Sequence, residues 1–173
     1  MALLQLAAVG LALGVGALVA GSPQHLLPAL GVLVTAGLVG ALGRPLTPLR
    51  LARPAPLTGL VAVLALVPAA AYAWDMARAT DNPEQTWGLD HYPTQAGFAV
   101  AVVLVAALAS YAAGSRRSAR LPALTAAFCA VWMGSLSLVW PDRIASLGTG
   151  WGVVAIAWGV VLAAVVTVET GPR

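Results

Sequence analysis

The stretch Gly148–Val168, GTGWGVVAIAWGVVLAAVVTV, decides the class of this chain. It contains no charged residue, and as a helix with a rise of about 1.5 Å per residue it is long enough to cross about 30 Å of hydrocarbon. The whole chain agrees, because 60% of its residues are hydrophobic and 9% are charged. That balance leaves too little polar surface for a soluble globule of 173 residues and predicts a membrane protein.

Five further apolar segments precede this one, and none has a charge at its centre. They are Ala2–Gly21, Leu26–Gly43, Leu57–Ala77, Pro93–Gly114 and Pro122–Trp140. Hydrocarbon offers no partner for backbone N–H and C=O groups, and no alternating strand pattern is present, so each segment is expected to be an α-helix. We therefore predict an all-α fold in which residues 1–173 form a single bundle of six transmembrane helices. The fifth segment carries Cys129, Ser135 and Ser137, and we expect it inside the bundle.

The arginines indicate how the bundle is oriented. Two connections between segments hold Arg44, Arg50 and Arg53, and Arg116, Arg117 and Arg120. Positive residues favour cytoplasmic loops, so both termini are predicted to be cytoplasmic and these six arginines to meet lipid headgroups. The basic residues have no interleaved aromatics, which argues against nucleic-acid binding despite the net charge of +3.

Polar, charged and aromatic residues are concentrated in the outward connection after the third segment. The candidate extracytoplasmic site there comprises Asp81, Glu84, Trp87, Asp90, His91 and Tyr92, with His25 from the first hairpin on the same side. Asp90 beside His91 could orient an imidazole for metal or haem binding. The alternative is a structural cap, with Asp90 serving the N-terminus of the fourth helix. Without a His-x-x-x-His spacing, the sequence predicts no particular metal or cofactor.

A stripe of small residues runs along the first segment, at Ala8, Ala12, Gly16 and Ala20. Such stripes let helix backbones approach closely, either inside one bundle or against a partner subunit. The first helix of the substrate-binding subunits of energy-coupling-factor vitamin transporters is similar, and those subunits have six helices and comparable length. That resemblance implies a carrier component.

Hydroxyl residues and one proline could instead line a solute path. These candidate lining residues are Thr35, Pro68, Ser110, Ser135 and Ser137. Pro68 lacks the N–H that its place in the third segment requires, so a kink is expected there. No Asp, Glu, Lys, Arg or His lies in the central third of any segment, which argues against an ion pump. No nucleophile motif supports an enzyme, and no catalytic residue is predicted.

Three short motifs resemble fragments of the acid-gated urea and amide channels. They are Thr58-Gly59-Leu60, Gly88-Leu89-Asp90, and Ala155-Ile156 with Gly159. The resemblance implies a six-helix channel for a small amide solute. The chain departs from that family where a membrane glutamate precedes the glycine of the last helix, because Trp158 stands there.

Two functions follow from these patterns. The first is a non-catalytic accessory or structural subunit of a larger membrane complex, and the second is a channel or carrier for a small neutral or weakly polar solute. A histidine-based metal or haem site ranks third. The expected partners are membrane lipids, and either other membrane subunits or further copies of this chain. The absence of Lys and the abundance of Ala, Gly, Val and Leu suggest a bacterial plasma membrane.

Overall fold

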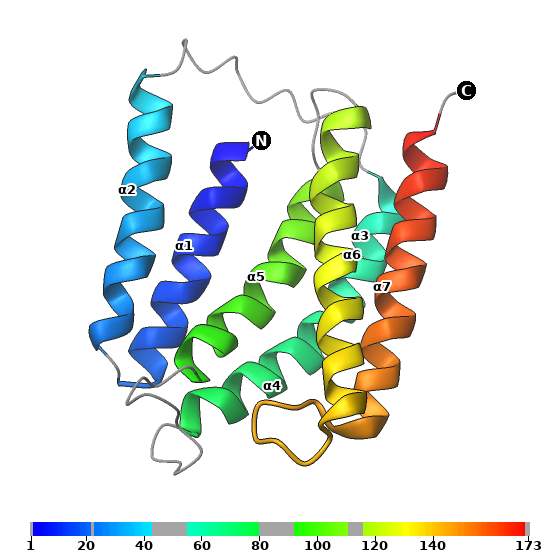
Figure 1. The fold of residues 1–173 in the computed structure, drawn as a ribbon. Coiled ribbons are helices and arrows are strands. Elements are labelled where there is room, and N and C mark those ends of the chain that lie inside the picture. The colour runs from blue at the N-terminus through cyan, green and yellow to red at the C-terminus, as the bar shows by residue number, and fades with distance from the viewer. Residues whose placement is uncertain (1, 22, 43–54, 80–91, 111–115, 172–173) are drawn as a thin grey trace. The chain divides into compact units, whose positions relative to one another are not determined.

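The computed structural model describes residues 2–21, 23–42, 55–79, 92–110 and 116–171, and nearly all of these are helical (Figure 1). The helices are α1 (Ala2–Val19), η1 (Pro23–His25), α2 (Leu26–Leu42), α3 (Pro56–Leu64), α4 (Leu66–Arg78), α5 (Tyr92–Ser110), α6 (Arg116–Val139) and α7 (Gly148–Thr170). The described part contains no strand. The all-α prediction is confirmed for these residues.

Four helical segments are long and apolar enough to cross a membrane. They are Pro56–Arg78, which combines α3 and α4, Tyr92–Ser110, Arg120–Val139 and Gly148–Thr170. Two shorter apolar helices, Gln5–Val19 and Leu26–Leu42, accompany them. Large apolar side chains are exposed on these helices, with Leu42 at 86% and Val168 at 81%. A surface of this kind suits lipid and is typical of a membrane protein.

The chain divides into two compact units. The N-terminal unit comprises Ala2–Pro45 and Val67–Ala101, and the C-terminal unit comprises Leu46–Leu66 and Val102–Arg173. The α5 helix is continuous and contributes residues to both.

In the N-terminal unit, glycines allow α1 to approach its neighbours. Gly21 follows the end of α1 and has φ 65°. Glycine adopts this left-handed conformation without steric cost. A Cβ at Gly16 would lie 2.8 Å from the Pro93 carbonyl oxygen, and a Cβ at Gly97 would lie 2.7 Å from the Cα of Leu13. The backbones of α1 and α5 are therefore in direct contact at Gly16 and Gly97.

The C-terminal unit is built on the pair α6 and α7, which run side by side (Figure 1). A Cβ at Gly134 of α6 would lie 2.5 Å from the Gly152 carbonyl oxygen, and a Cβ at Gly159 of α7 would lie 2.6 Å from the Ala127 carbonyl oxygen. These contacts involve backbone atoms at two heights along the pair. The two helices are therefore packed as closely as their main chains permit.

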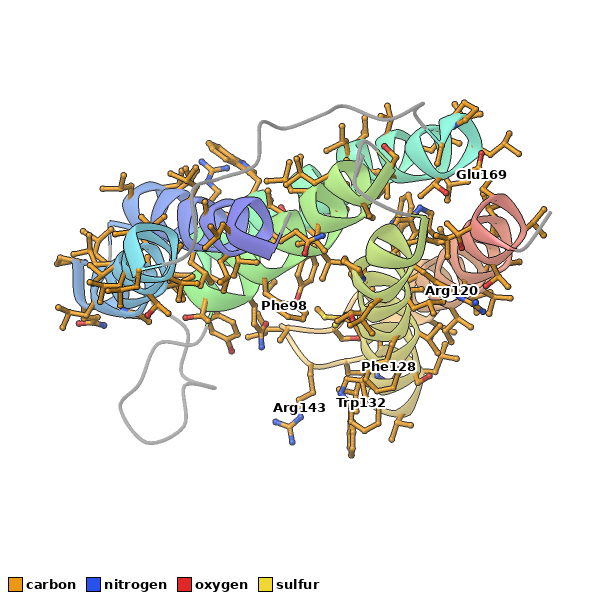
Figure 2. The ribbon with its side chains drawn as sticks, turned by 90° about the horizontal axis from the view of Figure 1, so that it is seen from above. Phe98, Arg120, Phe128, Trp132, Arg143 and Glu169 are labelled. Atoms are coloured by element: carbon orange, nitrogen blue, oxygen red, sulfur yellow. The ribbon has the colours of Figure 1, made fainter. Side chains whose placement is uncertain are left out.

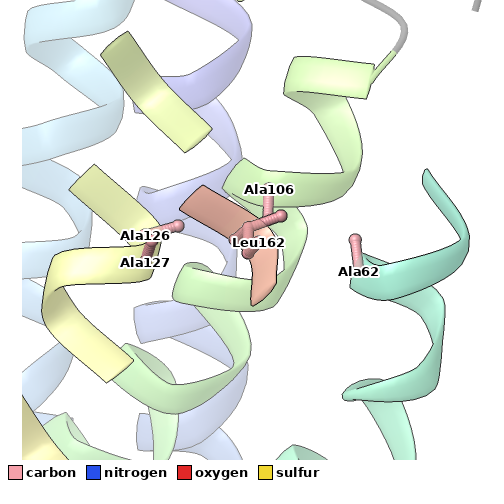
Figure 3. Close-up of a cluster of buried hydrophobic side chains, with 5 residues drawn as sticks. All are labelled: Ala62, Ala106, Ala126, Ala127 and Leu162. Carbon is pink, nitrogen blue, oxygen red and sulfur yellow. The ribbon is translucent and has the colours of Figure 1, made fainter. Parts of the chain in front are cut away.

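The core of the C-terminal unit consists mostly of alanines around one leucine (Figure 3). Ala62, Ala106, Ala126, Ala127 and Leu162 come from α3, α5, α6 and α7, and none is more than 3% exposed. Because alanine adds little volume, four helices can approach one another closely around Leu162.

The third apolar segment is interrupted between α3 and α4, at Ala65. The Ala65 N–H donates to the Ala62 carbonyl at 3.1 Å, a bond to the third residue back instead of the fourth. Pro68 has no N–H to donate to the carbonyl of Leu64, so the helical hydrogen bond between these two residues is also missing. The kink expected from Pro68 thus takes the form of a helix break three residues earlier.

Candidate functional site

A carboxylate from α7 holds the N-terminus of α3. Glu169 accepts hydrogen bonds from the Leu57 N–H at 3.0 Å through Oε1, and from the Thr58 N–H at 2.9 Å through Oε2. The Thr58 hydroxyl also donates to Oε2 at 2.6 Å, and Thr58 is only 1% exposed. Three donors on α3 therefore converge on one acidic group.

The sequence around α3 explains why an outside acceptor is needed. The first N–H groups of any helix have no partner within the helix. Pro56 removes one of them, but Ala55 at the N-cap has no side-chain oxygen to accept another. Glu169 lies 112 positions from Leu57 and takes that role. Its negative charge also complements the positive end of the α3 dipole.

A second contact between the same helices satisfies the helix break. The Trp158 indole N–H donates to the Val61 carbonyl at 2.7 Å. That carbonyl would ordinarily accept from the Ala65 N–H, which is bonded to Ala62 instead. A carbonyl without a partner is costly in hydrocarbon, so the indole stabilises the break. We call Leu57, Thr58, Val61, Trp158 and Glu169 together the α3–α7 joint.

The end of α5 completes the surroundings of this joint. The Ala55 N–H donates to the Ser110 carbonyl at 2.8 Å, and the Ser110 hydroxyl donates to the Ala107 carbonyl at 2.6 Å. A Cβ at Gly59 would lie 3.1 Å from the Ser110 Oγ, so only a small residue fits there. The arrangement holds the start of α3 in place from two sides.

The other candidate lining hydroxyls bond to their own helices. Thr35 donates to the Gly31 carbonyl at 2.8 Å, Ser135 to the Val131 carbonyl at 2.8 Å, and Ser137 to the Met133 carbonyl at 2.9 Å. Ser137 also accepts from the Leu147 N–H at 3.0 Å, next to the start of α7. Thr35 is exposed on α2, Ser135 is half-buried, and Ser137 and Ser110 are buried. Pro68 is half-buried at the start of α4.

Most of the predicted extracytoplasmic site lies outside the described residues. This applies to Asp81, Glu84, Trp87, Asp90 and His91, and to the side chain of His25 in η1. Tyr92 is described, is 7% exposed and begins α5. Across the described ranges, no three His, Cys, Asp or Glu side chains are grouped to hold a metal ion.

The predicted headgroup and packing residues are described in part. Arg120 is exposed, whereas Arg44, Arg50, Arg53 and the side chains of Arg116 and Arg117 lie outside the described part. In the small-residue stripe, Ala12 and Gly16 are buried where α1 meets α5. Ala8 and Ala20, one turn beyond at each end, are half-buried.

Sequence reasoning assigned no role to Glu169. Two features could have indicated one: it is a lone carboxylate at the end of an apolar segment, and Pro56-Leu57-Thr58 opens another segment with no capping side chain before it. The partner helix could not be deduced, because the two lie far apart in sequence. Sequence reasoning also gave no role to Tyr72 and Gln95. In the N-terminal unit, the Tyr72 hydroxyl donates to Gln95 Oε1 at 3.3 Å.

Comparison with known proteins adds no family to this picture. No protein-family model matches the chain, and no curated protein or solved structure matches it either.

Proposed function

We propose that this chain is a non-catalytic structural subunit of a larger membrane assembly. The observation that carries the proposal is the α3–α7 joint, in which a carboxylate and an indole are both occupied in fixing one helix to another. Functional polar groups inside membranes ordinarily face a cavity or a substrate. Here they rigidify the bundle, which is the property that a scaffold requires.

In this proposal the chain crosses a bacterial plasma membrane six times, with both termini in the cytoplasm. The 17 residues of α2 span about 26 Å as a helix, close to the hydrocarbon thickness. The arginine-rich connections support the orientation. Reporters that are active on only one side of the membrane, fused at each connection in turn, test it. Activity that does not alternate along the chain would contradict six crossings.

The subunit role is tested by purification of the tagged chain from its native membrane in a mild detergent. Mass spectrometry should find other membrane proteins in fixed stoichiometry with it. As a control, an unrelated six-helix protein that carries the same tag should not co-purify with these membrane proteins. Isolation without any partner, repeated in lipid nanodiscs, would contradict the proposal.

One observation favours a carrier as the second candidate. Helices interrupted within the membrane expose backbone groups that bind substrates or ions in many transporters, and the break at Ala65 is of this kind. The Val61 carbonyl at the break is already bonded to Trp158, which stands where the urea-channel family carries its glutamate. Uptake of urea, small amides and vitamins into proteoliposomes tests this candidate. Flux above that of empty vesicles would favour it over the structural role.

A further inference from the structure

We draw no further inference here: the strongest candidate, the exposed aromatic patch that Phe128 and Trp132 form on α6 (Figure 2), carries none, because nothing in the structure shows what covers it.

Discussion

The replacement Gly159→Ala tests whether α6 and α7 pack through their main chains. The added Cβ would lie 2.6 Å from the Ala127 carbonyl oxygen and 2.8 Å from Val131 Cγ2, whereas ordinary contact begins near 3.4 Å. The helices must therefore separate by about 0.8 Å at this point and lose part of their dispersion contacts. Overpacking of this kind costs about 1–3 kcal/mol, offset by up to about 1 kcal/mol because alanine favours a helix over glycine.

We expect Gly159→Ala to lower the free energy of unfolding by about 1–2 kcal/mol, a factor of about 5–30 in the equilibrium constant. Titration of a denaturing detergent into mild-detergent micelles, followed by tryptophan fluorescence, measures this change. Gly150→Ala is the matched control, because a Cβ there meets nothing within 4 Å and lies on the same helix. It should be neutral or slightly stabilising. If Gly159→Ala were as stable as Gly150→Ala, the close packing of α6 on α7 would be refuted.

Three further changes test the polar contacts. Glu169→Ala should speed hydrogen exchange at the Thr58 amide by about fivefold to thirtyfold, since loss of a helix cap costs about 1–2 kcal/mol locally, while Glu169→Gln should retain part of the protection. Trp158→Phe should reduce the free energy of unfolding by about 1–2 kcal/mol by leaving the Val61 carbonyl without its donor, and an unchanged unfolding curve would contradict that bond. Ser137→Ala should increase exchange of the backbone N–H just ahead of α7, with Thr167→Ala at an exposed α7 position as the unaffected control.

The sequence predicts the helical class and the break in the third segment well, because both follow from local chemistry. Uncharged runs such as Gly148–Val168 require helices in hydrocarbon, and Pro68 requires an interrupted ladder. At the N-terminal end, α2 has 17 residues, fewer than the roughly 20 that a crossing ordinarily takes. The ends of an apolar run do not fix the ends of the helix, because α6 begins at Arg116, six residues before the run that starts at Pro122.

The α3–α7 joint could not be predicted in the same way. The bond between Glu169 and Thr58 depends on which helices are neighbours, and that information is not local to either residue. Ser135 stays a candidate lining residue, and its hydroxyl donates to the Val131 carbonyl of its own helix.

The contact between Glu169 and the start of α3 also determines when the fold can be completed. Leu57 is synthesised 112 residues before Glu169, an interval of about 6–22 s at ordinary elongation rates. If α3 forms during that interval, its first N–H groups lack the Glu169 carboxylate as an acceptor. Until Glu169 is in place, water, lipid headgroups or the insertion machinery must accept hydrogen bonds from these N–H groups. In a nascent chain halted before α7 emerges, the N-terminus of α3 should therefore lack its hydrogen bonds to Glu169. These bonds can form only after α7 has been released.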